Sequence, residues 1–394
     1  MIDYLVWRGE LTFAASPWNA VDGLLMATLS YLNFHGHRDA RGWTMEEAKR
    51  LDLVIPSPDA SFTLRRDAFT GMADSFRFGS CRMHHFIAIS DEVSSMQFSA
   101  MCIDMPDGTM TVAFRGTDNT LIGWREDFDM AYRTWVPGQE AAGYYLSQAA
   151  AMTDRPLRLV GHSKGGNLAV YAAAVVHQSV QNRIESIWSY DGPGMNRQIS
   201  ATEGYQRIKG KIRSYIPQSS IIGLLMDYYT PYTVVHSTAT GLSQHDPMTW
   251  QVYGPKFEEM ESIDRKAEIV CETFHEWLQN STPEQRGAFV DTLFKMADTT
   301  DATKMSDILN EKLRSIRKMY SGRKEVDPET RRVFNRLMAQ AVTLWVGNVV
   351  ERVRGQKEEG VDERDWSTMM PEKPAIRAGK KASPEEPEED KKSS

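Results

Sequence analysis

The pattern of apolar and polar positions along the chain changes near residue 255. Before this point, short apolar runs of strand length alternate with amphipathic or small-residue segments of helical length. The pattern predicts strands at 96–104, 109–115, 158–160, 184–190, 212–216 and 232–235, and helices at 19–32 and 167–177. Strands that alternate with helices are typical of a largely parallel sheet, so we predict an α/β domain over residues 1–255.

After residue 255 the strand-like alternation disappears. Helices are predicted at 256–278, 283–296, 305–320 and 328–354. Two of them begin with a capping residue followed by proline, at Thr282-Pro283 and Asp327-Pro328. We therefore predict a separate all-helical module over residues 256–354. The last segment, 355–394, is charged and poor in large apolar residues, which predicts a disordered tail.

One motif in the first domain predicts chemistry. Gly161-His162-Ser163-Lys164-Gly165 fits the G-x-S-x-G nucleophile elbow, in which a strained turn exposes a serine hydroxyl above a sheet. The pattern alone arises often by chance, so its context decides. Here an apolar strand precedes it and a small-residue helix follows, as the elbow requires. We therefore predict that Ser163 is a nucleophile that attacks acyl carbon.

Composition narrows the possible functions. The 394 residues carry a formal net charge of -7, so no basic field attracts nucleic acid, and we expect no nucleic-acid partner. The three cysteines (Cys81, Cys102, Cys271) are widely spaced and odd in number, which predicts neither a disulfide framework nor a Cys-x-x-Cys metal site. With no N-terminal signal pattern and no apolar run of about 18 residues, the sequence predicts a cytoplasmic protein without a transmembrane segment.

Two groups of histidines, His84-His85 and His35 with His37, raise the question of a bound metal. Neither group has carboxylate or cysteine partners at the spacing of metal ligands. We therefore predict no metal site and no other cofactor.

A serine nucleophile needs donors for the oxyanion that develops on its substrate. The strand predicted at 109–115 runs into Phe114-Arg115-Gly116-Thr117, a turn where a backbone N–H can point into a site. We expect the amides of Thr117 and Lys164, the residue after the nucleophile, to form the oxyanion hole.

These two motifs together resemble the class 3 (fungal-type) lipases, in which an F-R-G-[ST] loop supplies the oxyanion hole and G-H-S-L-G-G carries the nucleophile. The chain more closely resembles the bacterial Mbeg-like proteins, a family of unknown function among the α/β hydrolases. The resemblance covers about residues 1–255 and implies an α/β-hydrolase fold with a mostly parallel central sheet and a lipase-like activity. The further motifs that carry it are Tyr4-Leu5-Val6-Trp7-Arg8-Gly9, Pro17-Trp18-Asn19-Ala20-Val21-Asp22, Tyr190-Asp191-Gly192-Pro193-Gly194 and Gln244-His245-Asp246-Pro247.

The base is expected to follow the nucleophile, because α/β hydrolases have the chain order serine, acid, histidine. His245 lies in a loop past the last predicted strand and within a family motif, so we predict it as the base. His236, at the end of a strand, is the reserve candidate. His177 lies on the helix just after Ser163, too close in sequence to fold back easily.

The acid is left open by the sequence. In the class 3 lipases it precedes a V-P-like segment, but the corresponding stretch 215–222 contains no carboxylate. Asp191, at the end of the preceding predicted strand, is the first candidate, and Asp227 is the second. Ser219 is a third possibility, because its hydroxyl can orient an imidazole by accepting its N–H.

Two further segments have more than one interpretation. Trp124, Asp127 and Phe128 either line an acyl pocket or belong to a helix that covers the sheet. The apolar run 221–226 either forms a lid or packs in the core. In both cases packing is the preferred interpretation.

The sequence leads to two functional hypotheses. The first is a serine hydrolase that cleaves a small-molecule or lipid ester through an acyl-enzyme intermediate, with Ser163, His245 and Asp191 as its triad. The alternative is a non-catalytic binding or scaffolding protein with the same fold. The missing acid after Pro217 and the helical extension favour this alternative.

Overall fold

The computed structural model describes residues 1–35, 41–59, 61–91, 96–118, 121–130, 132–224, 226 and 230–298. All of these lie in one compact unit, Met1–Asn348, and a second unit, Val349–Ser394, lies outside the described residues. The helices predicted at 305–320 and 328–354, the predicted tail and Asp227 also fall outside them. Within the described part of the chain, no helix is long and apolar enough to cross a membrane.

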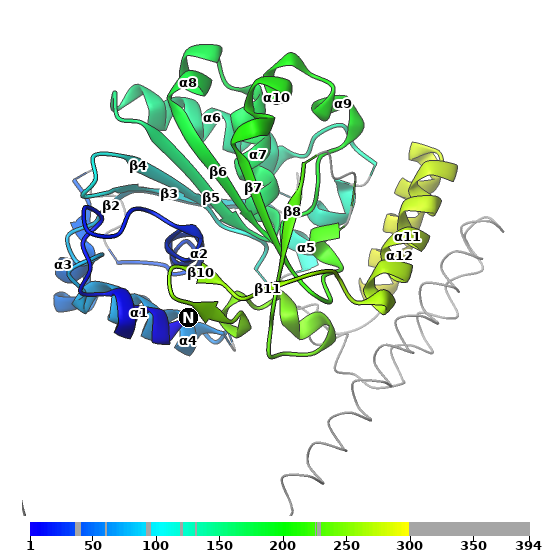
Figure 1. Cartoon of the computed structure of the whole chain (residues 1–394). Helices are drawn as coiled ribbons and strands as arrows, with labels where there is room; N and C mark the ends of the chain where they lie inside the picture. Colours follow the sequence, from blue (N-terminus) through cyan, green and yellow to red (C-terminus); the bar gives the residue numbers. More distant parts are fainter. Residues whose placement is uncertain are drawn as a thin grey trace, which may run out of the picture. The chain divides into compact units, whose positions relative to one another are not determined.

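A nine-stranded sheet forms the centre of the described structure, and its strands lie in the order β1-β2-β3-β4-β5-β6-β7-β8-β11 (Figure 1). Strands β4 to β8 run parallel, whereas β1 to β4 pair antiparallel at one side and β11 pairs antiparallel with β8 at the other. The bounds are β1 Trp43–Thr44, β2 Arg82–Asp91, β3 Met96–Asp104, β4 Met110–Phe114, β5 Leu157–His162, β6 Ile184–Tyr190, β7 Ile212–Pro217, β8 Tyr232–Val235 and β11 Glu259–Met260. A separate hairpin pairs β9 (Val252–Tyr253) with β10 (Lys256–Phe257).

Helices cover both faces of this sheet (Figure 1). Parallel strands in sequential order, joined by right-handed crossovers, place their connecting helices on one face, and α6, α7 and α10 lie there. Helix α2, with α1 and α4 behind it, covers the other face. The bounds are α1 Ile2–Arg8, α2 Ala20–Leu29, α3 Met45–Arg50, α4 Phe62–Asp74, α5 Leu121–Asp129, α6 Pro137–Ala151, α7 Lys164–Val175, α8 Gln178–Arg183, α9 Arg197–Ser200, α10 Glu203–Ile208, α11 Arg265–Asn280 and α12 Pro283–Asp298.

Two apolar cores follow from the alternation of side chains along the strands. Because successive residues of a strand point to opposite faces, Val112 and Phe114 of β4 pack with α6 and α7, while Ala113 between them packs with α2. Leu159 and Val160 of β5 divide in the same way. The α/β-hydrolase fold expected from the sequence is thereby confirmed.

Most of the predicted strands are confirmed, but the helix predicted at 256–278 is wrong in its first part. Residues 256–260 form β10 and β11, and α11 begins only at Arg265. Phe257 is buried among aromatic rings that include Trp250 and Tyr215. The sheet therefore continues past residue 255 through β11, which pairs with β8, while the buried Phe257 lies in the hairpin of β9 and β10.

A buried ion pair holds the N-terminal helices together. The guanidinium of Arg77 donates to both carboxylate oxygens of Asp22, at 2.8 Å through Nε and 2.5 Å through Nη2, and both side chains are fully buried. Tyr4 Oη donates to the same carboxylate at 2.7 Å, and Asn19 donates to Tyr4 Oη at 2.8 Å. The cluster joins α1, α2 and the turn after α4.

We expect Arg77→Met to lower the free energy of unfolding by about 3–5 kcal/mol, because it leaves the buried Asp22 carboxylate without its cation. Urea denaturation measures this loss. The control is Lys49→Met, which breaks an exposed pair with Asp74 and should cost less than about 1 kcal/mol. Equal losses in the two variants would contradict the role assigned to the Arg77 cluster.

Candidate functional site

The candidate site lies at the carboxyl ends of the parallel strands, the usual position of a ligand in an α/β sheet. Ser163 follows β5 and has φ 58° and ψ -135°, a backbone conformation that few non-glycine residues adopt. Glycine permits this turn, since a Cβ atom at Gly161 would lie 2.1 Å from the backbone of Gly165. The local geometry is therefore that of a nucleophile elbow, with α7 beginning at Lys164.

Asp191 follows β6, next to β5 in the sheet, and contacts His245. Its Oδ2 lies 2.5 Å from His245 Nδ1, and its side chain is only 1% exposed. The other carboxylate oxygen accepts the amide of Gly223 at 3.1 Å and the hydroxyl of Ser220. The carboxylate is thus held in place by three donors from two segments, the loop of His245 and the stretch 220–223.

The other candidates for base and acid have different partners. His236 Nδ1 lies 2.8 Å from Glu258, and the exposed His177 caps α8 by accepting the amide of Ser179. The Ser219 hydroxyl donates to Asp264 rather than to an imidazole. Of the sequence-based alternatives within the described residues, only Asp191 contacts His245.

The loop with the predicted oxyanion donor Thr117 lies directly against the turn at Ser163. A Cβ atom at Gly116 would lie 2.5 Å from the His162 carbonyl oxygen and 3.0 Å from Ser163 Cβ. Thr117 comes next, and its hydroxyl donates to Asp127 Oδ2 at 2.5 Å. The amide of Lys164 is among the first four of α7, which have no acceptor within a helix. The residue before the first predicted oxyanion donor is thus in contact with Ser163, and the second donor follows Ser163 in the chain.

Asp127, on α5, is the most perturbed carboxyl group near the site. Burial raises its pKa to about 6, although the Lys164 ammonium and the Thr117 hydroxyl oppose this shift. Its Oδ1 is buried and has no hydrogen-bond partner among the described residues. Two interpretations of Asp127 were open from the sequence, an acyl pocket or a helix that covers the sheet, and the structure places it on α5 in contact with Thr117. The side chain of Trp124 lies outside the described residues.

Lys164 contributes a buried charge that sequence reasoning missed. Its Nζ donates to Glu126 Oε2 and to the Gln97 carbonyl, each at 2.9 Å, and both charged side chains are 1% exposed. Glu126 also accepts the amides of Gln97 and Gly138, at 3.0 and 2.7 Å. A lysine at the start of a buried small-residue helix was the available signal, because buried lysines need a partner.

Tyr31 and His162 were also not recognised from the sequence. Tyr31 Oη lies 3.0 Å from His162 Nδ1, and His162 Nε2 lies 2.8 Å from the carbonyl oxygen of His245. Such contacts join residues 131 and 83 positions apart, so spacing along the chain gives no sign of them.

The described part of the segment 221–226 is buried at Gly223, Leu224 and Met226 and half-buried at positions 221 and 222. Leu224 is buried in a cluster with Ile216, Val234 and Cys271. Met226 is buried with Met130 and Val136, and position 225 lies outside the described residues. Packing, the preferred interpretation of this run, agrees with these contacts.

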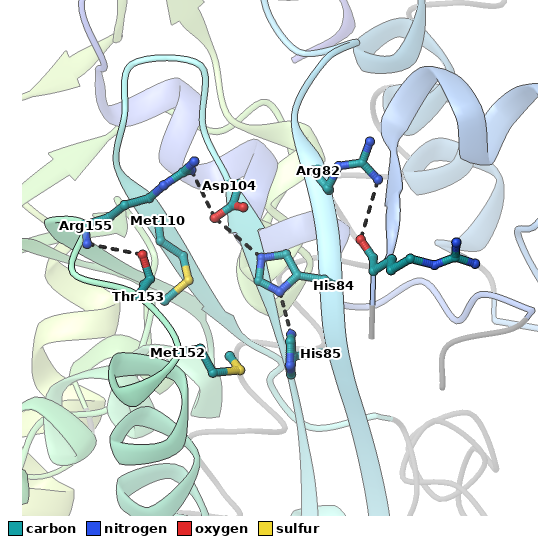
Figure 2. Close-up of a pocket in the computed structure, with 9 residues that line it drawn as sticks. Arg82, His84, His85, Asp104, Met110, Met152, Thr153 and Arg155 are labelled. Carbon is teal, nitrogen blue, oxygen red and sulfur yellow. Dashed lines mark hydrogen bonds and ion pairs between the residues drawn. The ribbon is translucent and has the colours of Figure 1, made fainter. Parts of the chain in front are cut away.

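Of the histidines considered as metal ligands, His84 and His85 line a separate cavity of 310 Å³ at the opposite ends of β4 and β5 (Figure 2), and His37 lies outside the described residues. His84 Nδ1 lies 2.6 Å from His85 Nδ1, and His84 Nε2 lies 3.5 Å from Asp104. A β-bulge in β2, with φ 52° at His85, brings the two imidazoles together, whereas a regular strand would separate them. Throughout the described residues, no group of three or more potential ligands is arranged to hold a metal ion.

We expect Asp127→Asn to flatten the pH dependence of stability. The folded chain binds the Asp127 proton more tightly than an unfolded chain, in which the aspartate pKa is about 3.9. This contribution to stability is full below about pH 4 and is lost as the pH rises through 6. Relative to the variant, the wild type should lose on the order of 1–2 kcal/mol between about pH 4 and 7.

Urea denaturation of both proteins across this range measures the difference. Asp154→Asn, at an exposed position, is the control. A constant difference between the wild type and Asp127→Asn at every pH would contradict the raised pKa.

Comparison with known proteins bears on the family and the fold. No curated protein matches the chain. A fungal lipase solved as an inhibitor complex is 12% identical, with 56% of this chain and 81% of that chain covered and a TM-score of 0.34. The lipase of Rhizopus microsporus var. chinensis is 16% identical, with 51% of this chain and 72% of that chain covered and a TM-score of 0.33. Another fungal lipase is 11% identical, with 64% of this chain and 90% of that chain covered and a TM-score of 0.37.

The family match includes all of the candidate site except its N-terminal contacts. The Mbeg1-like family model matches residues 72–295, which is more than half of the chain and includes Ser163, Asp191 and His245. It continues past residue 255, where the resemblance noted from the motifs ended. The chain therefore belongs to the Mbeg1-like family.

Proposed function

We propose that this protein is a serine hydrolase that cleaves an ester through an acyl-enzyme intermediate. The observation that carries the proposal is the 2.5 Å contact between buried Asp191 and His245 at the strand ends where Ser163 sits on its strained turn. These three residues also follow the chain order of α/β-hydrolase triads.

The chemistry follows from the hydrogen-bond roles. A carboxylate only accepts, so His245 Nδ1 carries the proton donated to Asp191, and Nε2 has the lone pair. Nε2 then removes the Ser163 proton as Oγ attacks the ester carbon, and returns it to the departing alcohol. A water molecule releases the acid in the second half, with His245 again as base, while Asp191 stabilises the imidazolium in both halves.

The oxyanion is assigned to the amides of Thr117 and Lys164. Each donor of this kind contributes roughly 3–4 kcal/mol to lowering the barrier. The hydroxyl contact with Asp127 holds Thr117, and the buried Glu126 contact holds the side chain of Lys164. Both donors therefore have supporting contacts that reduce reorganisation during the reaction.

Two observations favour an enzyme over a scaffold. Ser163 and Asp191 both have positive φ, 58° and 49°, and such strain costs on the order of 1–3 kcal/mol at each residue. A binding surface gains nothing from this cost, whereas a nucleophile elbow depends on it. The absence of a carboxylate after Pro217 no longer argues against an enzyme, because Asp191, at the end of another strand, contacts His245.

A fluorophosphonate probe should label the wild-type protein and leave Ser163→Ala unlabelled, because only an activated serine reacts with it. Ser219→Ala is the matched control, since it removes a hydroxyl that bonds Asp264 instead, and it should label like the wild type. Mass spectrometry of the labelled peptide locates the site. A folded wild-type protein that takes up no label would rule out the hydrolase and leave the scaffold.

We expect Asp191→Asn to lower kcat for a short-chain p-nitrophenyl ester by about 10³–10⁴-fold, because the amide no longer fixes the His245 tautomer. His245→Ala should lose still more, approaching about 10⁶-fold. Asp264→Asn, an exposed carboxylate on the loop before α11, is the control and should retain the wild-type rate. Wild-type turnover by Asp191→Asn would remove Asp191 from the mechanism.

A further inference from the structure

Two side chains outside the proposed triad lie directly behind it. His162 packs its ring against His245, with 4.6 Å between ring centroids. Its Nε2 lies 2.8 Å from the His245 carbonyl oxygen, and its Nδ1 lies 3.0 Å from Tyr31 Oη. The three residues come from the loop before β9, the end of β5 and the segment after α2.

The direction of each hydrogen bond in this chain is fixed by chemistry. A backbone carbonyl only accepts, so His162 Nε2 must carry the hydrogen. Burial lowers the pKa of His162 far below its ordinary value, so the ring is neutral and Nδ1 is an acceptor. The Tyr31 hydroxyl therefore donates to His162 Nδ1. This bond selects the tautomer of His162 that is protonated at Nε2 and can donate to the His245 carbonyl.

The same hydroxyl also contacts the oxyanion loop. Burial raises the pKa of Tyr31, and a hydrogen bond with the backbone of Gly116 opposes that shift. A Cβ atom at Gly116 would lie 2.2 Å from Tyr31 Oη, so the contact is as close as glycine permits. Arg65 of α4 holds the ring from outside, with its guanidinium carbon 4.3 Å from the ring centroid.

We propose that Tyr31 and His162 are positioning residues that hold the loop of the base and the oxyanion loop in a fixed relation. His162 fixes the backbone of His245, and Tyr31 fixes both His162 and the Gly116 turn. This inference rests on the proposed hydrolase function. It also gives the N-terminal segment a role at the site, because Tyr31 belongs to the part of the chain that covers the sheet.

Steric filling alone does not require this arrangement. An apolar side chain at position 162 would occupy similar space but would leave the His245 carbonyl without a donor. The Nε2-protonated tautomer of His162 affects the reaction only if the position of the His245 backbone does. Fixing two loops through one hydroxyl reduces the motion that separates the base from the oxyanion donors, and such misplacement of about 1 Å costs roughly 100-fold in rate.

The first test separates rate from binding in the full-length protein. Tyr31→Phe removes only the hydroxyl and should lower kcat about tenfold with KM unchanged. Tyr144→Phe, at an exposed position on α6, is the control and should keep the wild-type values. His162→Gln retains an N–H where Nε2 lies and should keep at least about ten times more activity than His162→Asn, which does not reach the carbonyl.

The second test needs no turnover. Nitrogen-15 chemical shifts of the histidines, assigned with His162→Gln, should show His162 as neutral and protonated at Nε2 in the wild type. In Tyr31→Phe the Nδ1-protonated form or a mixture should appear. Melting temperatures establish that each variant is folded.

The outcomes are distinct. A wild type that hydrolyses no ester and takes no probe contradicts the proposed function. The nitrogen shifts then still show whether Tyr31 sets the tautomer of His162. A wild type that turns over while Tyr31→Phe keeps its full kcat and the Nε2 tautomer overturns the positioning role alone. A lower kcat together with a changed tautomer supports it.

Discussion

Close contact between backbone segments is the constraint on which the candidate site depends. Strands β4 and β5 and helix α7 meet where Gly116 and Gly161 leave no room for a Cβ atom. The contact sets the strained turn at Ser163 and, at the same time, the position of the loop that carries Thr117. Since packed interiors yield little to compression, a displacement of one segment must be shared by the others. The proposed nucleophile and the proposed oxyanion donors are therefore positioned by one packing arrangement.

Two buried ion pairs join helices to their neighbouring segments. The Lys164–Glu126 pair joins the elbow to α5, and the Arg77–Asp22 pair joins the segment after α4 to α2. Buried ion pairs add little net stability, but a structure that separates them is strongly disfavoured. We infer that these pairs select one arrangement of the helices around the sheet, which apolar packing alone leaves less defined.

The sequence predicted those elements whose pattern is local. The strands at Met96–Asp104, Ile184–Tyr190 and Tyr232–Val235 have the predicted bounds, because continuous apolar or alternating runs end at turn residues. Strand β2 was missed, since its bulge at His85 and its exposed end interrupt the alternation. Strands β10 and β11 have only two residues each, too few to leave a period in the sequence.

The site divides in the same way. Ser163 and the Gly116-Thr117 turn belong to contiguous motifs, and His245 could be chosen by chain order. The acid stayed open because its identity depends on which strand ends lie together. Asp191 approaches His245 because β5, β6, β7 and β8 are neighbours in that order. The roles of Glu126 and Tyr31 could not be predicted from the sequence, since their contacts exist only after both faces of the sheet are covered.

The order of the strands also has a consequence for folding during synthesis. Helix α2 is made before the surface that it covers, which includes β4, β5, β6 and β10 and is complete only at Phe257. At about 5–20 residues per second, the apolar side of α2 waits roughly 10–45 s for this surface. A nascent chain with an exposed apolar helix is prone to aggregation over such an interval. Helix α2 is thus made well before the strands on which it docks, so its apolar side stays uncovered while they are synthesised.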